Sequence, residues 1–230
     1  MKNFLFMLLL TLSPALLFAQ DNAVPAETRL FDNVTLDSFD FYLDENGKKD
    51  SVFSIEDGVL KVNVSKPFGW ICTKREYKNF SLSVEYRWSE KVEPVNSGIF
   101  LRISGEPKMF LPHGFEVQLQ HNNAGDIYGF HGKKISGEKE RYIENLNHKA
   151  GELRGVKRIQ GAESLPGEWN KVNITCFEGL IVVRMNGKIV NWAFGAETAA
   201  GKIGFQSEGG QVEFRNAVIV EEPGNIDSAK

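Results

Sequence analysis

Residues 80–88 read FSLSVEYRW and decide the fold class, because apolar and polar side chains alternate at every position. A β-strand with one buried face and one exposed face requires this period of two. The same alternation recurs at residues 59–64 (VLKVNV) and 115–120 (FEVQLQ), and no long amphipathic helix can be traced. The sequence therefore predicts an all-β protein.

Turn-forming residues lie between these runs. Asp57-Gly58 and Asn186-Gly187 supply the positive φ angles of two-residue hairpin turns, and strand-like residues flank each pair. Near the end of the chain, residues 202–206 and 211–219 are expected to pair around a turn at 208–210. Many short strands with regular turns indicate two packed antiparallel sheets in a single domain.

One stretch departs from this pattern. Residues 131–166 are polar, rich in Lys, Arg, Glu and Gly, and show no sustained alternation. A connection of this length within a compact domain is usually a functional or mobile loop. The alternative is a solvated insertion with a turn of helix around residues 141–147.

The N-terminus has the features of a secretory signal. Lys2 provides a positive charge, residues 4–10 and 15–18 are apolar, and Ala19 is a small residue at a plausible cleavage point. This predicts a signal peptide over residues 1–20 and one β-sandwich domain over 21–230, with its core at about 30–220. The apolar run is interrupted by Pro14 and too short to cross a bilayer, so we expect a periplasmic or secreted protein without membrane insertion.

Charge and cysteine content restrict the function further. The formal net charge is −3, with acidic and basic residues interspersed, which is no electrostatic footprint for nucleic acid. The chain has two cysteines, Cys72 and Cys176, each in a strand-like run. Export would permit a disulfide, but we favour free cysteines that pack as small apolar residues. The sequence does not indicate the oligomeric state.

Candidate site residues begin with the strand at 114–121. Phe115, Val117 and Leu119 would face the core, which places Glu116, Gln118 and Gln120 in a row on the other face. Carboxylates and amides are suited to reading sugar hydroxyls. The alternative is that these residues are simply the solvent-exposed face of the strand, since any half-exposed strand has a row of polar side chains.

Neighbouring segments add further candidates. Arg102 ends the run at 96–102 and could pair with Glu116 or grip a substrate oxygen. Tyr128 lies between glycines, close in sequence to His121 and His131, and would serve as a platform for a sugar ring or as a packing residue.

The sequence contains no recognised metal-binding motif. The four histidines lack HExxH spacing, and there is no CxxC pair. Glu116 and Asp126 could contribute oxygen ligands to Ca²⁺, but six or more oxygens cannot be assembled from the sequence. No cofactor is assigned, no metal ligand is predicted, and a divalent cation is left open.

Several short motifs follow one another in a characteristic order. They lie at residues 68–70 (FGW), 96–102 (NSGIFLR), 114–118 (GFEVQ), 125–129 (GDIYG), 167–170 (GEWN), 185–187 (MNG) and 201–206 (GKIGFQ). In this order and spacing the chain resembles the 3-keto-disaccharide hydrolase family from about residue 30 to 220. The resemblance implies a concanavalin A-like jelly roll that acts, in a groove across one concave sheet, on glycosides oxidised at C3.

The resemblance also implies roles for particular residues. Family members often carry Glu-x-Gln-x-x-Asp on the central strand, which matches Glu116 and Gln118, while His121 stands in the place of Asp. Glu116 and His121 are therefore the predicted catalytic residues, because one base can remove the C2 hydrogen that the ketone acidifies. The predicted substrate-binding residues are Asn96, Arg102, Gln118, Gln120, Tyr128, His131 and Gln206.

Two other functions stay open from the sequence. The same fold serves lectins, so a non-catalytic carbohydrate-binding module is the alternative to a glycosidase. A structural role with residues 131–166 as a partner contact is the third reading.

Overall fold

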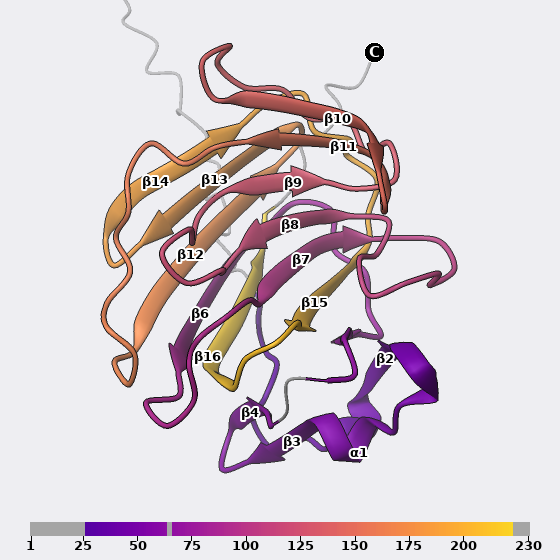
Figure 1. Ribbon diagram of the computed structural model, residues 1–230, viewed down its shortest axis with the longest axis vertical. Coiled ribbons are helices and arrows are strands. Elements are labelled where there is room, and N and C mark those ends of the chain that lie inside the picture. The colour runs from indigo at the N-terminus through magenta and orange to yellow at the C-terminus, as the bar shows by residue number, and fades with distance from the viewer. Residues whose placement is uncertain (1–25, 64–65, 223–230) are drawn as a thin grey trace, which may run out of the picture.

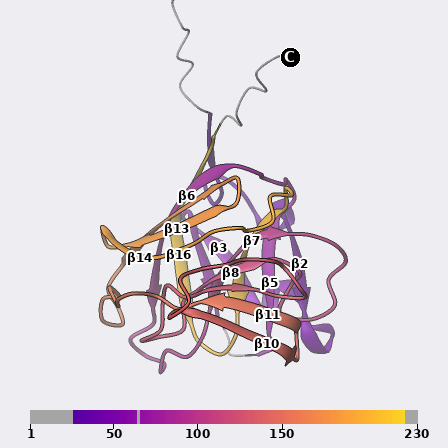
Figure 2. The ribbon, with the colours of Figure 1, turned by 90° about the horizontal axis from the view of Figure 1, so that it is seen from above.

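The computed structural model describes residues 26–63 and 66–222, which form two antiparallel sheets packed face to face (Figures 1 and 2). In sheet A the strand order is β14-β13-β12-β6-β16-β4-β3, with β1 also paired to β16. In sheet B the order is β10-β11-β9-β8-β7-β15-β5-β2. The predicted all-β jelly-roll sandwich is confirmed.

The elements have these bounds. Sheet A contains β1 (Glu27–Arg29), β3 (Phe53–Glu56), β4 (Val59–Val62), β6 (Phe80–Trp88), β12 (Asn170–Phe177), β13 (Leu180–Met185), β14 (Lys188–Ala193) and β16 (Val212–Glu221). Sheet B contains β2 (Phe39–Leu43), β5 (Gly69–Thr73), β7 (Gly98–Ile103), β8 (Phe115–Gln118), β9 (Ile127–Gly129), β10 (Tyr142–His148), β11 (Gly151–Val156) and β15 (Lys202–Ser207). The helical elements are short: α1 (Lys49–Val52) and the 3₁₀ turns Leu36–Ser38 and Asp44–Asn46. Within the described residues, no helix has the length and apolarity needed to span a membrane.

The main core lies between the two sheets. Along β6 every second residue, from Phe80 to Trp88, is buried, as the alternation in the sequence predicts. From the opposite sheet, Phe115, Val117 and Leu119 enter the same core. This fixes which way β8 faces: its even-numbered side chains point to the outer face of sheet B.

A second, smaller apolar cluster covers part of that outer face. Residues 104–113, here named the covering segment, fold across sheet B and bring Phe110 and Leu111 against Trp70 and Phe100. The strands β7 and β8 are consequently buried on both faces. The covering segment also creates the walls of the hollows described below.

The two predicted hairpin turns are confirmed. Asn186 and Gly187 have φ angles of 49° and 81° and join β13 to β14, while Asp57 and Gly58, at 50° and 74°, join β3 to β4. Positive φ at both central residues is the requirement that Asn-Gly and Asp-Gly meet at low cost.

The expected pairing of residues 202–206 with 211–219 is wrong. Both segments are strands, but β15 lies in sheet B between β7 and β5, and β16 lies in sheet A between β6 and β4. The connection crosses from one layer to the other, so Phe205 and Phe214 meet inside the core with ring centroids 5.0 Å apart. In β15 five consecutive residues are buried, whereas β16 has the alternating burial of a strand with one open face.

The reading of residues 131–166 as a loop with a helical turn is also wrong. The segment contains the antiparallel pair β10 and β11, and β11 in turn pairs with β9. Most of β10 is partly or fully exposed because it is the edge strand of sheet B. Only Tyr142 and Ile143, at its start, pack against the apolar clusters, so the alternation used to detect strands is missing.

The cysteines are free, as favoured from the sequence. Cys176 lies in the core between the sheets and Cys72 on the outer face of sheet B, both buried. Burial raises the pKa of each thiol to about 12, so neither is reactive at neutral pH. The predicted signal peptide lies outside the described residues.

Candidate functional site

Glu116 lies at the centre of sheet B, on the outer face. The strand register aligns it with Phe100 on β7 and with Tyr128 on β9. Its side chain is 2 % exposed and borders a pocket of about 320 Å³. The pocket is lined by Asn96, Leu111, Glu116, Gln118, Tyr128, Phe130, Ile143, Asn145, His148, Lys149, Leu153 and Glu208. We call it the Glu116 pocket.

Two glycines give the pocket its shape. A Cβ at Gly98 would lie 2.2 Å from Glu116 Oε1, so only glycine leaves room for the carboxyl group. A Cβ at Gly155, which pairs with Tyr128, would lie 2.7 Å from the Tyr128 ring. The absence of side chains at these positions leaves room for the Glu116 and Tyr128 side chains in the pocket lining.

The environment of Glu116 favours its protonated form. Burial is the main cause that raises its pKa well above the usual value, and the charges of Glu208 and Asp126 raise it further. Its Oε1 atom has no hydrogen-bond partner. A buried carboxyl group with neither a cation nor a full set of donors holds its proton to a higher pH than an exposed one.

Glu208 is a second carboxyl group in the same pocket, although it is not among the predicted site residues. Its Oε2 accepts hydrogen bonds from Asn96 Nδ2 and Gln206 Nε2, both at 2.8 Å. Burial raises its pKa above the usual value, and the charge of Lys149 and the two amide donors offset only part of this rise. A signal was available: Glu208 is two residues beyond Gln206, so continued alternation along β15 would have placed both side chains on one face.

Acceptor oxygens without donors gather around these two carboxyl groups. The side-chain oxygens Asn96 Oδ1, Glu116 Oε1 and Gln206 Oε1 are buried without a partner. Buried acceptors are normally satisfied, so this cluster indicates a ligand that brings donors. Sugar hydroxyl groups would do so.

These oxygens are also of the kind that a hard cation prefers. However, the described residues contain no group of three or more His, Cys, Asp or Glu side chains arranged to hold a metal. Asn96, Glu116 and Glu208 are the residues available to a divalent cation, and whether one binds stays an open prediction.

Aromatic rings form one wall of the pocket. Tyr128 stacks on Phe130, and Phe130 on His148, with ring centroids 6.3 Å and 6.2 Å apart. The hydroxyl group of Tyr128 donates to Asp126 Oδ2 at 2.9 Å and accepts from Lys157 Nζ at 2.7 Å. Held at its polar end, the Tyr128 ring is a rigid apolar surface of the kind that covers the C–H face of a sugar.

The prediction that Arg102 pairs with Glu116 or grips substrate is wrong. Strand β7 has one residue more than β15 between their paired positions, and Arg102 takes a φ of 51° at this bulge. The bulge reverses the alternation and turns Arg102 inward. Its guanidinium is fully buried and donates to the backbone carbonyls of Lys78, Glu178 and Glu197. Arg102 is a structural residue.

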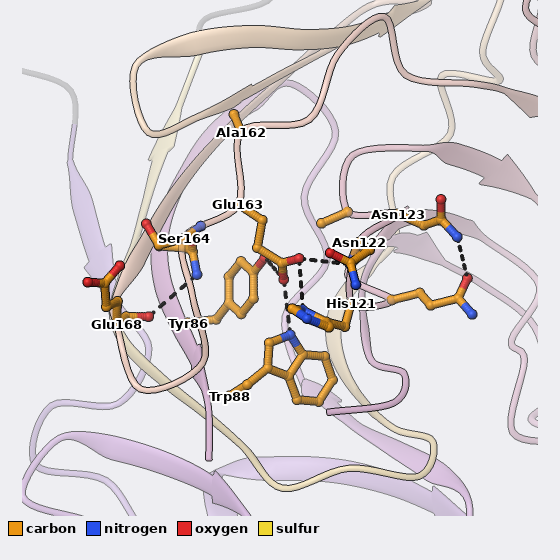
Figure 3. A network of polar contacts seen from close by, with 12 residues as sticks. Tyr86, Trp88, His121, Asn122, Asn123, Ala162, Glu163, Ser164 and Glu168 are labelled. Carbon is orange, nitrogen blue, oxygen red and sulfur yellow. Dashed lines mark hydrogen bonds and ion pairs between the residues drawn. The ribbon is translucent and has the colours of Figure 1, made fainter. Parts of the chain in front are cut away.

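His121 does not reach the pocket either, which contradicts its predicted catalytic role beside Glu116. It lies beyond the end of β8 with Nδ1 3.1 Å from Glu163 Oε2 (Figure 3). Glu163 also accepts hydrogen bonds from the Tyr86 hydroxyl group, the Trp88 indole N–H and the backbone N–H of Asn122. We call these residues the Glu163 cluster; the figure shows them converging on one carboxylate.

The remaining predicted residues divide into two groups. Asn96, Gln118 and Tyr128 line the pocket with Glu116, and Gln206 binds Glu208 beside it. Gln120 is exposed past the strand end, with its side chain bonded to Asn123. His131 borders a different hollow with His113, and its Nε2 lies 2.9 Å from the Leu111 carbonyl oxygen. The sequence also gave no indication of the wall that Asn145, His148 and Lys149 form, because β10 was not recognised.

Comparison with known proteins agrees with this architecture. Residues 26–220 match the family described as the 3-keto-alpha-glucoside-1,2-lyase-like domain. No curated protein sequence matches the chain.

Solved structures show the same fold at low sequence identity. A candidate glycosyl hydrolase from Parabacteroides distasonis has a TM-score of 0.60 and 20% identity over 86% of this chain and 94% of its own. The carbohydrate-binding module CBM66 from Bacillus subtilis has a TM-score of 0.58 and 9% identity over 80% and 96%. The laminarinase catalytic domain from Thermotoga maritima has a TM-score of 0.55 and 12% identity over 86% and 98%.

Proposed function

The chain belongs to the 3-keto-alpha-glucoside-1,2-lyase-like family, and we propose that it cleaves glycosides whose sugar carries a ketone at C3, in the Glu116 pocket. One observation carries this proposal. Buried oxygens without hydrogen-bond donors surround two carboxyl groups, and the pKa of Glu116 is raised more than that of Glu208. A sugar would supply the missing donors, and the carboxyl pair would supply an acid and a base.

The environments of the two carboxyl groups assign their roles. Glu116 has no donor on Oε1 and keeps its proton, so it is the acid. The pKa of Glu208 is raised less, because two amides and Lys149 stabilise its charge, so Glu208 ionises before Glu116 and is the base. Neighbouring groups whose environments separate their pKa values in this way are the usual basis of acid–base assignments.

The proposed reaction is an elimination followed by addition of water. Glu208 takes the C2 proton, which the adjacent ketone makes acidic. The C–H electron pair forms a C1–C2 double bond, the bond from C1 to the glycosidic oxygen breaks, and Glu116 gives its proton to that oxygen. Water then adds at C1, a proton returns to C2, and the products are the free 3-keto sugar and the released alcohol.

The first experiment measures release of the leaving group from an aryl 3-keto-glucoside. We expect Glu116→Gln and Glu208→Gln each to lower kcat by about 10²–10⁴, the usual worth of a general acid or base. Gln120→Ala is the control, because Gln120 is exposed outside the pocket, and it should match the wild type. Wild-type rates in both carboxyl variants would refute the assignment.

A non-catalytic carbohydrate-binding module is the second candidate, because such a module shares the fold. It predicts saturable glycan binding with no product after long incubation. A purely structural role through residues 131–166 is the third candidate, and deleting residues 133–153 does not test it cleanly, since β10 and β11 contribute to the pocket wall. Deleting them would alter the sugar site as well.

We also propose that the protein is exported to the periplasm or secreted. The proposal rests on the charged and apolar pattern of residues 1–20. Fractionation of cells producing the full chain, with N-terminal sequencing of the product, tests it. Retention of Met1 in a cytoplasmic product would refute export.

A further inference from the structure

A second hollow lies on the same face of sheet B, across the covering segment from the Glu116 pocket. The segment is anchored to the sheet where Trp70 Nε1 donates to the Met109 carbonyl at 3.4 Å and Tyr42 donates to that of Lys108 at 3.3 Å. Leu111 faces the Glu116 pocket, and residues 104–107 face the second hollow. Its volume is about 770 Å³, against about 320 Å³ for the Glu116 pocket.

The floor of this hollow continues the strand row that contains Glu116. From Glu116 the register passes through Phe100 and Gly204 to Cys72 and then Asp40. Cys72 is three strands from Glu116, which corresponds to about 14 Å at the usual strand spacing. The hollow is therefore too distant to be part of the space around Glu116.

The lining combines an exposed aromatic ring with paired charges. Phe41 is 42% exposed at the rim of the hollow, on the opposite face of the edge strand β2 from Asp40, and Lys49 lies over its ring, 5.5 Å from the centroid. Lys49 also pairs with Asp37 at 3.1 Å, and Lys202 pairs with Asp40 at 2.5 Å. The polar groups thus provide both donors and acceptors around an apolar surface, the combination that a polyhydroxylated ring needs.

The charge balance argues against a strongly ionic ligand. Four acidic residues, Asp37, Asp40, Glu76 and Glu106, line the hollow with three lysines, Lys49, Lys74 and Lys202. A phosphate or nucleotide site would carry a clear excess of positive charge. The near-balance favours a neutral ligand.

We infer that the hollow lined by Phe41, Asp40 and Lys202 is a second carbohydrate site, which binds a neutral glycan separately from the Glu116 pocket. The inference rests on the proposed function for the choice of a carbohydrate. It gives the protein a place to hold a long glycan that is independent of the cleavage pocket.

The test is isothermal titration calorimetry with neutral oligosaccharides of glucose and of xylose, in α and β linkages, together with the cleavage assay. We expect at least one glycan to bind both the wild type and Glu116→Gln. Phe41→Ala should weaken that binding about tenfold, as loss of an aromatic contact does, while cleavage of the small aryl substrate stays unchanged. Asp40→Asn should weaken it as well.

The control is Phe194→Ala, another exposed aromatic residue, which borders neither hollow. Thermal unfolding at the wild-type temperature shows that each variant folds. Binding that is insensitive to Phe41→Ala, or no binding of any glycan in the set, overturns the inference. Binding that depends on Phe41 without any cleavage would instead overturn the proposed enzymatic function and leave the second site standing.

Discussion

Two glutamates of low exposure in this sandwich have opposite surroundings. Glu163 accepts three hydrogen bonds, from Tyr86, Trp88 and Asn122, and lies beside His121 at one end of the core. Glu116 is buried on the outer face of sheet B, with no partner on Oε1 and with two other acidic residues that raise its pKa.

The difference separates a structural carboxylate from a functional one. The donors around Glu163 compensate the cost of burying its charge and tie the 157–169 connection to β6 and to the end of β8. Glu116 has no such donor on Oε1, so part of the cost of its burial is not compensated by a hydrogen bond. Such a cost is characteristic of a site arranged for a ligand or a proton transfer.

Activity should show the largest contrast between the two glutamates. Glu116→Gln is expected to lower kcat on the 3-keto-glucoside by about 10²–10⁴, because the acid is lost. Glu163→Gln keeps an acceptor in the cluster and leaves the pocket intact, so kcat should change less than about threefold. If steady-state assays gave the same loss of kcat for both variants, Glu116 would not be functionally distinct from Glu163.

Arg102 extends the comparison to a buried cation that is fully partnered. Arg102→Met removes the donors to three carbonyls, and we expect a loss of roughly 3–5 kcal/mol in the free energy of unfolding. Arg184→Met, at an exposed position of β13, should cost less than about 0.5 kcal/mol. Urea unfolding of both variants measures the difference, and equal midpoints would show that the carbonyl contacts of Arg102 contribute little.

Removing the Glu163 carboxylate should destabilise the fold by a smaller amount. Glu163→Ala leaves the Trp88 indole and the Tyr86 hydroxyl without their acceptor, which predicts a loss of roughly 2–4 kcal/mol. Glu168→Ala on the same connection is the control. Unfolding of the three proteins in urea reports the effect, and an unchanged midpoint for Glu163→Ala would mean that water replaces the carboxylate.

The smallest expected effect is a gain in stability that depends on pH. The pKa of Glu116 is higher in the folded protein than in the unfolded chain, so the folded state retains a proton that the unfolded chain releases. The free energy of unfolding of the wild type therefore falls as pH rises from about 4.3 toward the folded-state pKa.

Glu116→Gln does not titrate, so its melting temperature should exceed that of the wild type by an amount that grows from pH 4 to pH 8. Differential scanning calorimetry across this range measures it. A constant difference, or a wild type that is more stable at pH 8, would show that Glu116 is ionised at neutral pH and cannot be the acid.

Most of the fold could be predicted where a strand has one buried face. The alternation in β6 and the Asn-Gly turn of β13 and β14 report local requirements that any sandwich imposes. The prediction failed for β10, whose edge position needs no apolar face, and for the pairing of β15 with β16. A short connection between two strands looks alike whether it turns within one sheet or crosses to the other.

The candidate site divides in the same way. The sequence by itself determined that Glu116 and Gln118 share a face opposite the core, because a strand alternates with a fixed period. Only the tertiary structure decided that Glu208 joins them, that a bulge turns Arg102 inward and that His121 belongs to the Glu163 cluster. The physical reason is that alternation is a property of one strand, whereas bulges, sheet crossings and partners across the sandwich depend on segments far apart in the chain.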